Sequence, residues 1–521
     1  MHALPSQPHP ALNQAPMSLS HVCRDWRNAV LSLPQAWQEL FLEIHVTFFR
    51  GGHLHRMTGT WFNRAKSLPL SLFLHINHEG IPKDGLDSFD ESVRDFIRDL
   101  SSAFLSQVRH LGLSADQVLH YVPFFQEPII FPTLKLQSLT LNMNRPISPS
   151  DYSSYLNDSS DESDDIFVFE TLLGLQRLSL DDPITFRGFG RRMFPWPQLT
   201  DLCLMRWISL TSWSSLLKRC PLLQTGTFHL SYETDDADEE SEDGPDDKTK
   251  PVHSHLEDLR VFIHDMNMDV MRCFQTCRFP SLRRLHVSHD HEFVDIDRTR
   301  KPVGYFPDEF ASLKTLSVEG DWSESVQVLY ELFLTADSVT QLAVKISLDA
   351  LNLLEIMTHK KDDDYDDGLR DREYWETPTG PRFNLPNLLS LTLVIGHVTD
   401  HETPKLLRSI QKMLESRMAE HLKPSQRLKK FRILFSPPND AISDKVRSLL
   451  QSYLHVGFDF EVGGHLPPHT GIVSLDEWKY GVQGRMAMKK LAHAEQKARR
   501  FTNVTSDPSL LLLLNIPEYY P

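Results

Sequence analysis

Apolar residues recur along most of this chain in a short pattern: a leucine, two other residues, a second leucine, one residue, and a further apolar residue. The pattern occurs at 136–141, 175–180, 199–204, 256–261, 282–287, 313–318, 339–344 and 388–393, and in looser form at 108–113 and 428–433. Its fourth and sixth positions are two residues apart, the period at which side chains share one face of a β-strand. Each copy therefore predicts a strand with one apolar face.

One such strand cannot bury its apolar face alone, so the copies are expected to stack on one another. Helical spacing of apolar residues predicts helices over 92–106, 212–221 and 403–418, the last beginning with Thr403 and Pro404. We therefore predict an α/β fold, an irregular leucine-rich-repeat solenoid with parallel strands on one face and helices on the other. The alternative is that the pattern marks only ordinary half-buried strands. A single copy would not exclude this alternative, whereas the many copies present favour the solenoid.

Polar and acidic segments interrupt the repeats near 151–165, 231–251 and 359–381. Residues 158–165 (DSSDESDD) carry five acids and 233–247 carry ten, so these two runs explain nearly all of the net charge of −16. They are too polar to pack, and we predict disordered loops, either plainly solvated or open to an acid-directed kinase. The chain divides into a disordered N-terminus (1–18), a helical segment (19–50), the repeat array (51–465), and a basic helix with a tail (466–521).

Composition places the chain among folded proteins of a reducing compartment. Hydrophobic residues make up 40% of its 521 residues and charged residues 24%, and five cysteines do not form a disulfide framework. The N-terminus lacks the charged and apolar regions of a secretory leader, and no apolar run is long enough to span a bilayer. We expect a soluble protein of the cytoplasm, the nucleus or both.

Motifs that carry chemistry were not found. The sequence contains no phosphate-binding glycine loop, no GxSxG elbow and no HExxH. The tightest histidine cluster is HVSHDHEF, in which His286 falls at an outward strand position while His289 and His291 fall in the loop that follows. We therefore expect no metal, no cofactor and no catalytic residue, and predict that the protein is not an enzyme. A hydrolase or metalloenzyme on an unrecognised fold is the alternative, which a pocket of converging ionisable groups would favour.

The segment at 19–42 (LSHVCRDWRNAVLSLPQAWQELFL) differs from the repeats. It predicts a short amphipathic helix with Val22, Trp26 and Val30 on one side, a turn at Pro34, and a second, buried tryptophan at Trp37. Two tryptophans carry more apolar area than so short a unit can bury by itself. We therefore expect this segment to need a further surface to pack against.

This segment resembles the C-terminal half of the F-box-like domains of mushroom-forming fungi. The matching positions are Val22, Cys23, Arg24, Trp26, Arg27, Pro34 and Trp37. The likeness continues into WFNRAKSLPLSLFLHI at 61–76, which is similar to the tryptophan helix and strand that follow the F-box, and CPLLQ at 220–224 is similar to the turn that closes a leucine-rich-repeat helix. The first half of such a domain, a leucine–proline–acid start followed by a helix, is missing from residues 1–18.

The resemblance implies an adaptor. F-box modules dock onto the small adaptor subunit of a cullin–RING ubiquitin ligase while the repeats hold the protein to be ubiquitinated. It implies that the contacts to the adaptor come from Val22, Cys23, Trp26, Arg27, Pro34 and Trp37. Because the first half of the module is missing, the alternative is a leucine-rich-repeat scaffold that has lost ligase docking.

The repeat geometry also supplies a candidate surface for the substrate protein, made of outward strand positions. These are Arg177, Asp201, Met205, Asp258, Arg260, Phe262, Arg284, His286 and Glu319. Their mixed charge favours a protein partner over nucleic acid or a membrane. Plain solvent exposure is the alternative explanation for each of them.

Overall fold

The computed structural model describes the chain from residue 16 to residue 463 with gaps. The gaps are 46–52, 79–80, 82–84, 105, 116–134, 144–171, 173, 182–193, 232–251, 264–273, 275–276, 290–309, 311, 321–331, 334–335, 347–353, 355–356, 359–384, 397, 420–421, 423–425, 436–438 and 454–457. The predicted insertions near 151–165 and 359–381, nearly all of 231–251, most of 1–18 and all of 466–521 thus lie outside the described residues.

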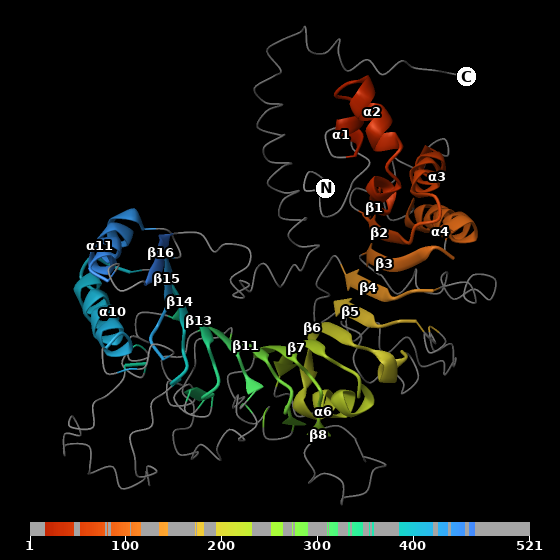
Figure 1. Cartoon of the computed structure of the whole chain (residues 1–521). Coiled ribbons are helices and arrows are strands. Elements are labelled where there is room, and N and C mark those ends of the chain that lie inside the picture. Colours follow the sequence, from red (N-terminus) through yellow and green to blue (C-terminus); the bar gives the residue numbers. More distant parts are fainter. Residues whose placement is uncertain are drawn as a thin grey trace, which may run out of the picture.

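The described part is an α/β fold built on one open, fourteen-stranded parallel sheet, in which each strand pairs with its neighbours in chain order (Figure 1). The strands are β1 (Glu39–Ile44), β2 (Leu70–Ile76), β3 (Val108–Ala115), β4 (Ser138–Met143), β5 (Arg177–Asp181), β6 (Asp201–Ser209), β7 (Thr225–Ser231), β9 (Asp258–Ile263), β11 (Arg284–His289), β12 (Thr315–Gly320), β13 (Gln341–Ile346), β14 (Ser390–Ile395), β15 (Lys430–Phe435) and β16 (Asp459–Gly463). The short strands β8 (Val252–His253) and β10 (Cys277–Arg278) pair separately. Every copy of the leucine pattern forms a strand, as predicted.

The second leucine of the pattern forms a ladder across the sheet. Strand register places in one row Leu40, Leu72, Leu111, Leu139, Leu178, Leu202, Gly226, Leu259, Leu285, Leu316, Leu342, Leu391, Phe431 and Phe460. From Leu40 to Phe431 the leucines and Phe431 in this row are at most 2% exposed. Parallel in-register pairing therefore gathers the repeated leucines into one continuous apolar face.

Gly226 in β7 is the exception within this ladder, and it explains why the pattern missed that strand. A Cβ at Gly226 would lie 2.5 Å from Cε2 of Phe228, two residues further along the same strand. Phe228 is fully buried, so its ring takes the space that a leucine fills in the other strands. The two positions together supply one large apolar group, and the ladder stays packed.

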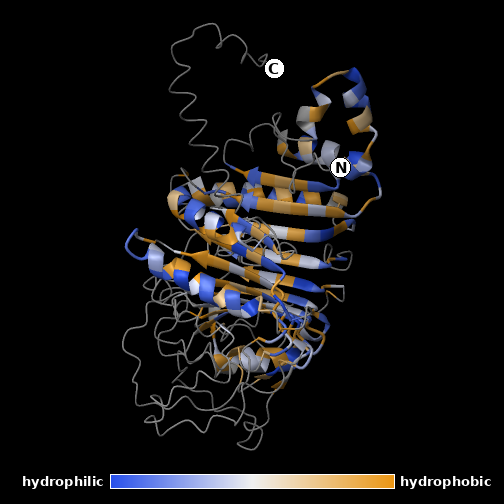
Figure 2. Ribbon diagram, turned by 60° about the vertical axis from the view of Figure 1, so that its left-hand side comes forward, coloured by the Kyte–Doolittle hydropathy of each residue, from blue (hydrophilic) through white to orange (hydrophobic). Residues whose placement is uncertain are grey.

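Helices line the outer side of the curved sheet (Figure 1). They are α3 (His53–Ala65), α4 (Leu86–Phe104), α6 (Leu210–Arg219), α10 (Thr403–Arg417) and α11 (Asp440–Gln451). Their apolar faces join the leucine ladder in one core, which Figure 2 shows as orange positions on strands and helices. The helices predicted at 212–221 and 403–418 are α6 and α10; the one predicted at 92–106 is α4, which begins six residues earlier, at Leu86.

Side chains at the start of α6 and α11 satisfy backbone groups that a helix leaves unpaired. The Oγ of Ser209 accepts a hydrogen bond from the backbone N–H of Ser212 at 3.2 Å, and the Oδ1 of Asn439 accepts one from Ile442 at 3.1 Å. The helix α10 begins at Thr403, as predicted, and the residue before it, Glu402, makes no such side-chain hydrogen bond to the first turn.

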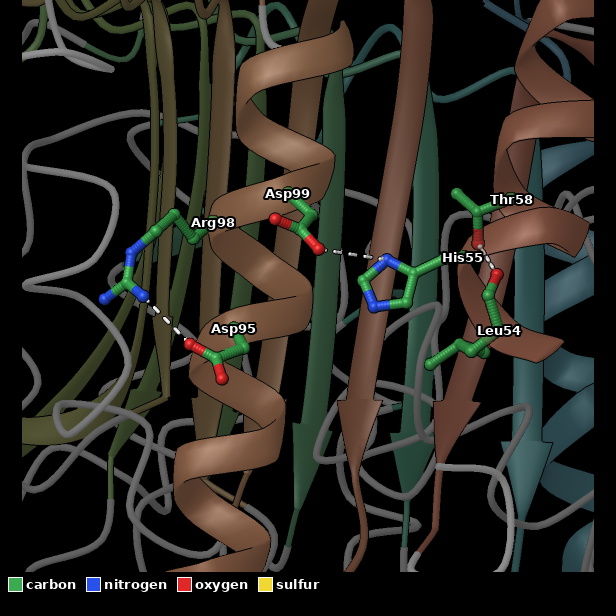
Figure 3. A network of polar contacts seen from close by, with 6 residues as sticks. All are labelled: Leu54, His55, Thr58, Asp95, Arg98 and Asp99. Carbon is green, nitrogen blue, oxygen red and sulfur yellow. Dashed lines mark hydrogen bonds and ion pairs between the residues drawn. The ribbon is translucent and has the colours of Figure 1, made fainter. Parts of the chain in front are cut away.

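The first two helices beside the sheet, α3 and α4, also meet through polar side chains (Figure 3). Nδ1 of His55 in α3 lies 3.7 Å from Oδ2 of Asp99 in α4, and the His55 ring packs edge-on against Phe96. Within α4, Arg98 pairs with Asp95 one turn earlier, at 2.8 Å. Both pairs are largely exposed, so we assign the stability of this contact mainly to the buried apolar residues.

The N-terminal segment folds as α1 (Met17–Ser20), α2 (Arg24–Leu31) and a 3-10 turn, η1 (Pro34–Trp37). The prediction of a helical segment over 19–50 is wrong beyond this turn, because Glu39–Ile44 form β1, the first strand of the sheet. Trp37 is fully buried, as predicted. Its indole N–H donates to the carbonyl of Val30 at 2.9 Å, its ring meets that of Trp61 edge-on with centroids 4.9 Å apart, and the Arg64 guanidinium lies 4.3 Å above it. Since Trp61 and Arg64 belong to α3, Trp37 fixes the segment to the first strand–helix unit.

No helix in the described part of the chain combines the length and the apolar character needed to cross a membrane.

Candidate interaction surfaces

The face of the sheet opposite the leucine ladder is the inner, concave one, because the helices occupy the outer side (Figure 1). Strand register sets Arg177 beside Asp201, and Asp258 beside Arg284. The next outward positions place Arg260 beside His286. Residues far apart in sequence therefore lie next to one another on this face, which we call the polar face.

Five charged residues of the polar face form what we call the central charge cluster: Arg177, Asp201, Asp258, Arg260 and Arg284. The Asp258 carboxylate binds two of them, with Arg284 Nε 2.9 Å from Oδ2 and Arg260 Nε 3.7 Å from Oδ1. Burial raises the pKa of Asp201, while the nearby charges of Arg177 and Arg260 lower it and Asp258 raises it further. One cluster thus extends from β5 to β11.

An aromatic stack lies beside this cluster on β7, β9 and β11. Phe262 stacks on His229 with ring centroids 4.6 Å apart and lies 5.5 Å from the ring of His286. His286 Nδ1 shares a 3.0 Å hydrogen bond with Ser317 Oγ. Burial, and secondly the charge of Arg260, lowers the pKa of His286 to about 3, so its imidazole is neutral at physiological pH.

Glu319 in β12 is the most deeply buried acid of this face, at 2% exposure. Lys345 of the next strand, β13, donates to its Oε1 at 2.6 Å, and the lysine side chain is 41% exposed. Sequence reasoning missed Lys345, although it occupies the same outward position in its strand that Glu319 does in β12. Extending the leucine pattern by one residue would have found it.

The predicted residues of the polar face differ in how much surface they offer to a partner. Arg177 and Arg284 are exposed, whereas Asp201, Arg260 and Met205 are half-buried. Asp258, Phe262, His286 and Glu319 are buried and position their neighbours instead. Met205 lies where β6 shifts register against β7, and its sulfur is 3.5 Å from that of Cys203.

Apolar side chains also occur at outward positions, which the sequence pattern did not indicate. Ala343, Val394 and Leu434 of β13, β14 and β15 form a small buried cluster apart from the main core. Within the described residues the polar face therefore carries an apolar patch across β13, β14 and β15 as well as its charged positions.

The N-terminal segment forms the second candidate surface, which we call the N-terminal patch: Val22, Cys23, Trp26 and Arg27. Val22 is 64% exposed and Trp26 51%, although both are large and apolar. Cys23 and Arg27 are exposed as well, and Arg27 Nε donates to the carbonyl of Ser20 at 2.9 Å. The predicted apolar stripe is thus divided: Val30 packs against the array with Trp37, while Val22 and Trp26 face solvent.

The remaining residues of the predicted adaptor contact take structural positions. Trp37 is buried against α3, and Pro34, half-buried, begins the 3-10 turn that places it there. Among the residues that the structure describes, no group of three or more His, Cys, Asp or Glu side chains is placed to hold a metal ion. Comparison of the sequence with family models and with curated proteins finds no match.

Proposed function

We propose that this protein is a leucine-rich-repeat adaptor of F-box type, which holds a substrate protein on its polar face and docks onto the small adaptor subunit of a cullin–RING ubiquitin ligase through its N-terminal patch. Such a protein performs no bond chemistry itself. It raises the concentration of the substrate beside the ligase by binding both.

The observation that carries the proposal is the exposure of Trp26 on a segment anchored by Trp37. A half-exposed tryptophan leaves a large apolar area in contact with water, which is unfavourable. Exposed large aromatic residues of this kind are typical of protein–protein contacts. The anchor between Trp37 and α3 holds the N-terminal patch at a fixed place relative to the sheet. A fixed geometry is what an adaptor needs to present one protein to another.

The repeat part of the proposal rests on the sheet. Strands that pair in chain order, an in-register leucine ladder and helices on the outer side are the features of a leucine-rich-repeat solenoid. The curved inner face of such arrays is a common binding surface. Mixed charges on this face favour a protein as its occupant.

Co-purification tests the proposal. We expect the tagged full-length chain, co-expressed with the small adaptor subunit and the cullin, to retain both. Trp26→Ala should lose them, because removing a central aromatic contact weakens binding by about thirtyfold. The matched control is Leu222→Ala, which truncates another exposed apolar side chain, 56% exposed, on the array.

Both variants should keep the thermal unfolding midpoint of the unaltered chain, since each truncates an exposed side chain. Retention of both ligase subunits by Trp26→Ala would contradict the assigned docking surface. Failure of the unaltered chain to retain them, with other proteins still bound, would instead indicate a repeat scaffold without ligase docking.

A further inference from the structure

Positive and negative groups of the polar face lie at different depths. The Arg284 side chain is 63% exposed while its partner Asp258 is 11%, and the Lys345 side chain is 41% exposed while its partner Glu319 is 3%. Arginine and lysine are longer than the acids, so their charged ends extend past the carboxylates into solvent. The centre of the face therefore offers mainly cations to anything that approaches it.

The order is reversed at the C-terminal end of the sheet. Between β15 and β16 the acids are the more exposed partners: Glu461 at 48% against 17% for Arg432, and Asp459 at 72% against 44% for Lys430. Exposed cations over buried acids are thus a local property of the centre, and β15 provides a comparison at equivalent strand positions.

Arg177 extends this arrangement to β5. It is exposed, and within the described residues no carboxylate oxygen lies near enough to form an ion pair with it; its charge acts on Asp201 and His110 at longer range. The Asp201 carboxylate in the next strand is half-buried, and this burial raises its pKa. Among the residues that the structure describes, the exposed guanidinium of Arg177 is therefore more accessible to a partner than the half-buried carboxylate of Asp201 beside it.

We propose that Arg177, Arg260 and Arg284, which we call the cation row, bind an extended acidic segment of the partner protein. This inference rests on the proposed function, because it names the chemical class of the substrate segment. Arg177 and Arg284 stand four strand steps apart, on β5 and β11. At about 4.8 Å per step this is about 19 Å, the length of about six residues of extended chain.

An acidic protein segment fits this row better than a nucleic acid does. Phe262, the aromatic residue two positions after Arg260, is 1% exposed and offers no ring on which a base can stack. Asp258 lies beneath Arg260 and Arg284, so a continuous row of phosphates would meet negative charge between the cations. A few carboxylates spaced along a peptide avoid that repulsion.

The test measures binding of fluorescein-labelled peptides of about twelve residues, with glutamate and glycine alternating, to the full chain by fluorescence anisotropy. A twin peptide carries glutamine in place of glutamate. We expect the twin to bind at least about tenfold more weakly, and added salt to weaken only the glutamate peptide. A labelled oligothymidine of equal length serves as the nucleic-acid probe.

The double variant Arg177→Gln/Arg284→Gln should bind the glutamate peptide about tenfold more weakly than the unaltered chain. The matched control Lys430→Gln/Arg432→Gln removes two cations from outward positions on β15, Lys430 in the row of Arg284 and Arg432 in the row of Arg260. It should change affinity less than about twofold. Arg177→Glu is a second variant, and it breaks no ion pair of the described residues. Because it reverses a charge of the cation row, it should also weaken binding of the glutamate peptide.

Equal binding of both peptides, equal losses in the two double variants, or oligothymidine binding as tight as that of the glutamate peptide would each overturn the proposal. The ligase role is tested separately through Trp26. A chain that binds the glutamate peptide but retains no cullin adaptor would refute the proposed function and leave the cation row standing, and the reverse result would do the opposite.

Discussion

The two faces of the one sheet differ in how strictly they are specified. On the outer, apolar face the same row holds leucine in strand after strand, buried to 2% or less. On the polar face the corresponding row changes from Arg177 through Asp258 to Thr315. The apolar row has one physical task, to fill space against the helices, whereas the polar row is free to vary with what it contacts.

Truncating a ladder leucine should produce the largest loss of stability. Leu316→Ala removes a fully buried side chain from β12, and we expect the free energy of unfolding to fall by about 2–5 kcal/mol, since the packed core cannot close over the cavity. Thr315→Ala, one residue earlier on the other face, should change it by less than about 0.5 kcal/mol. Denaturant unfolding followed by circular dichroism measures both; similar losses would contradict the difference between the faces.

Arg417 tests whether the helix-covered side of the sheet tolerates a buried charge because that charge is hydrogen-bonded to backbone carbonyls. This α10 side chain is 2% exposed and donates to the carbonyls of Met357 at 2.8 Å and Leu385 at 2.9 Å. Arg417→Met keeps the aliphatic length but leaves both carbonyls without this donor, and we expect a loss of about 3 kcal/mol. Lys412→Met, on the exposed side of the same helix, is the control, and an equal effect in thermal unfolding would refute the assignment.

A substitution at Gly226 tests whether each strand needs a leucine at this row or only enough side-chain volume to fill the core. Gly226→Ala restores a side chain at the row position, yet its Cβ would meet the Phe228 ring. We expect a loss of about 1–3 kcal/mol because the site is already full. If the alanine variant were as stable as the parent, the proposed exchange of space between Gly226 and Phe228 would be wrong.

The buried His286 of the polar face should make the stability of the protein depend on pH. Its pKa in the folded chain is lowered from 6.5 to about 3, so between these values the unfolded chain binds a proton that the folded chain does not. Stability is therefore lost as pH falls from 6.5 towards 3, with a slope of up to about 1.4 kcal/mol per pH unit. His286→Gln should lose less stability over this range; identical profiles would contradict a neutral buried imidazole.

The sequence predicts the apolar face well and the polar face only in outline. Leucine spacing locates strands such as β11 and β12 because burial of a repeated side chain leaves a periodic trace. It misses β7, where Gly226 and Phe228 share the space of one leucine, and β16, where Phe460 and Val462 stand in the leucine positions. It also misses β1, which lies inside the segment predicted as helical. Those strands are recognisable only from their neighbours in the sheet.

The periodicity of the sequence does not predict how deeply each side chain of the candidate surfaces is buried. Alternation correctly assigns Arg284 and His286 to the polar face, but one is exposed and the other buried. Likewise the spacing of Val22, Trp26 and Val30 predicts one stripe, and only Val30 packs against the array. These differences arise from contacts between residues distant in sequence, such as that of Trp37 with Trp61.

Equilibrium binding of the purified small adaptor subunit of a cullin–RING ligase tests the central claim most directly. Three chains are compared: the unaltered protein, Trp26→Ala, and Arg177→Gln/Arg284→Gln. The adaptor role predicts binding by the first, a loss of about thirtyfold in the second, and no change in the third, because docking and substrate binding use separate surfaces. Absence of binding by the unaltered chain, or equal affinity of all three, would contradict it.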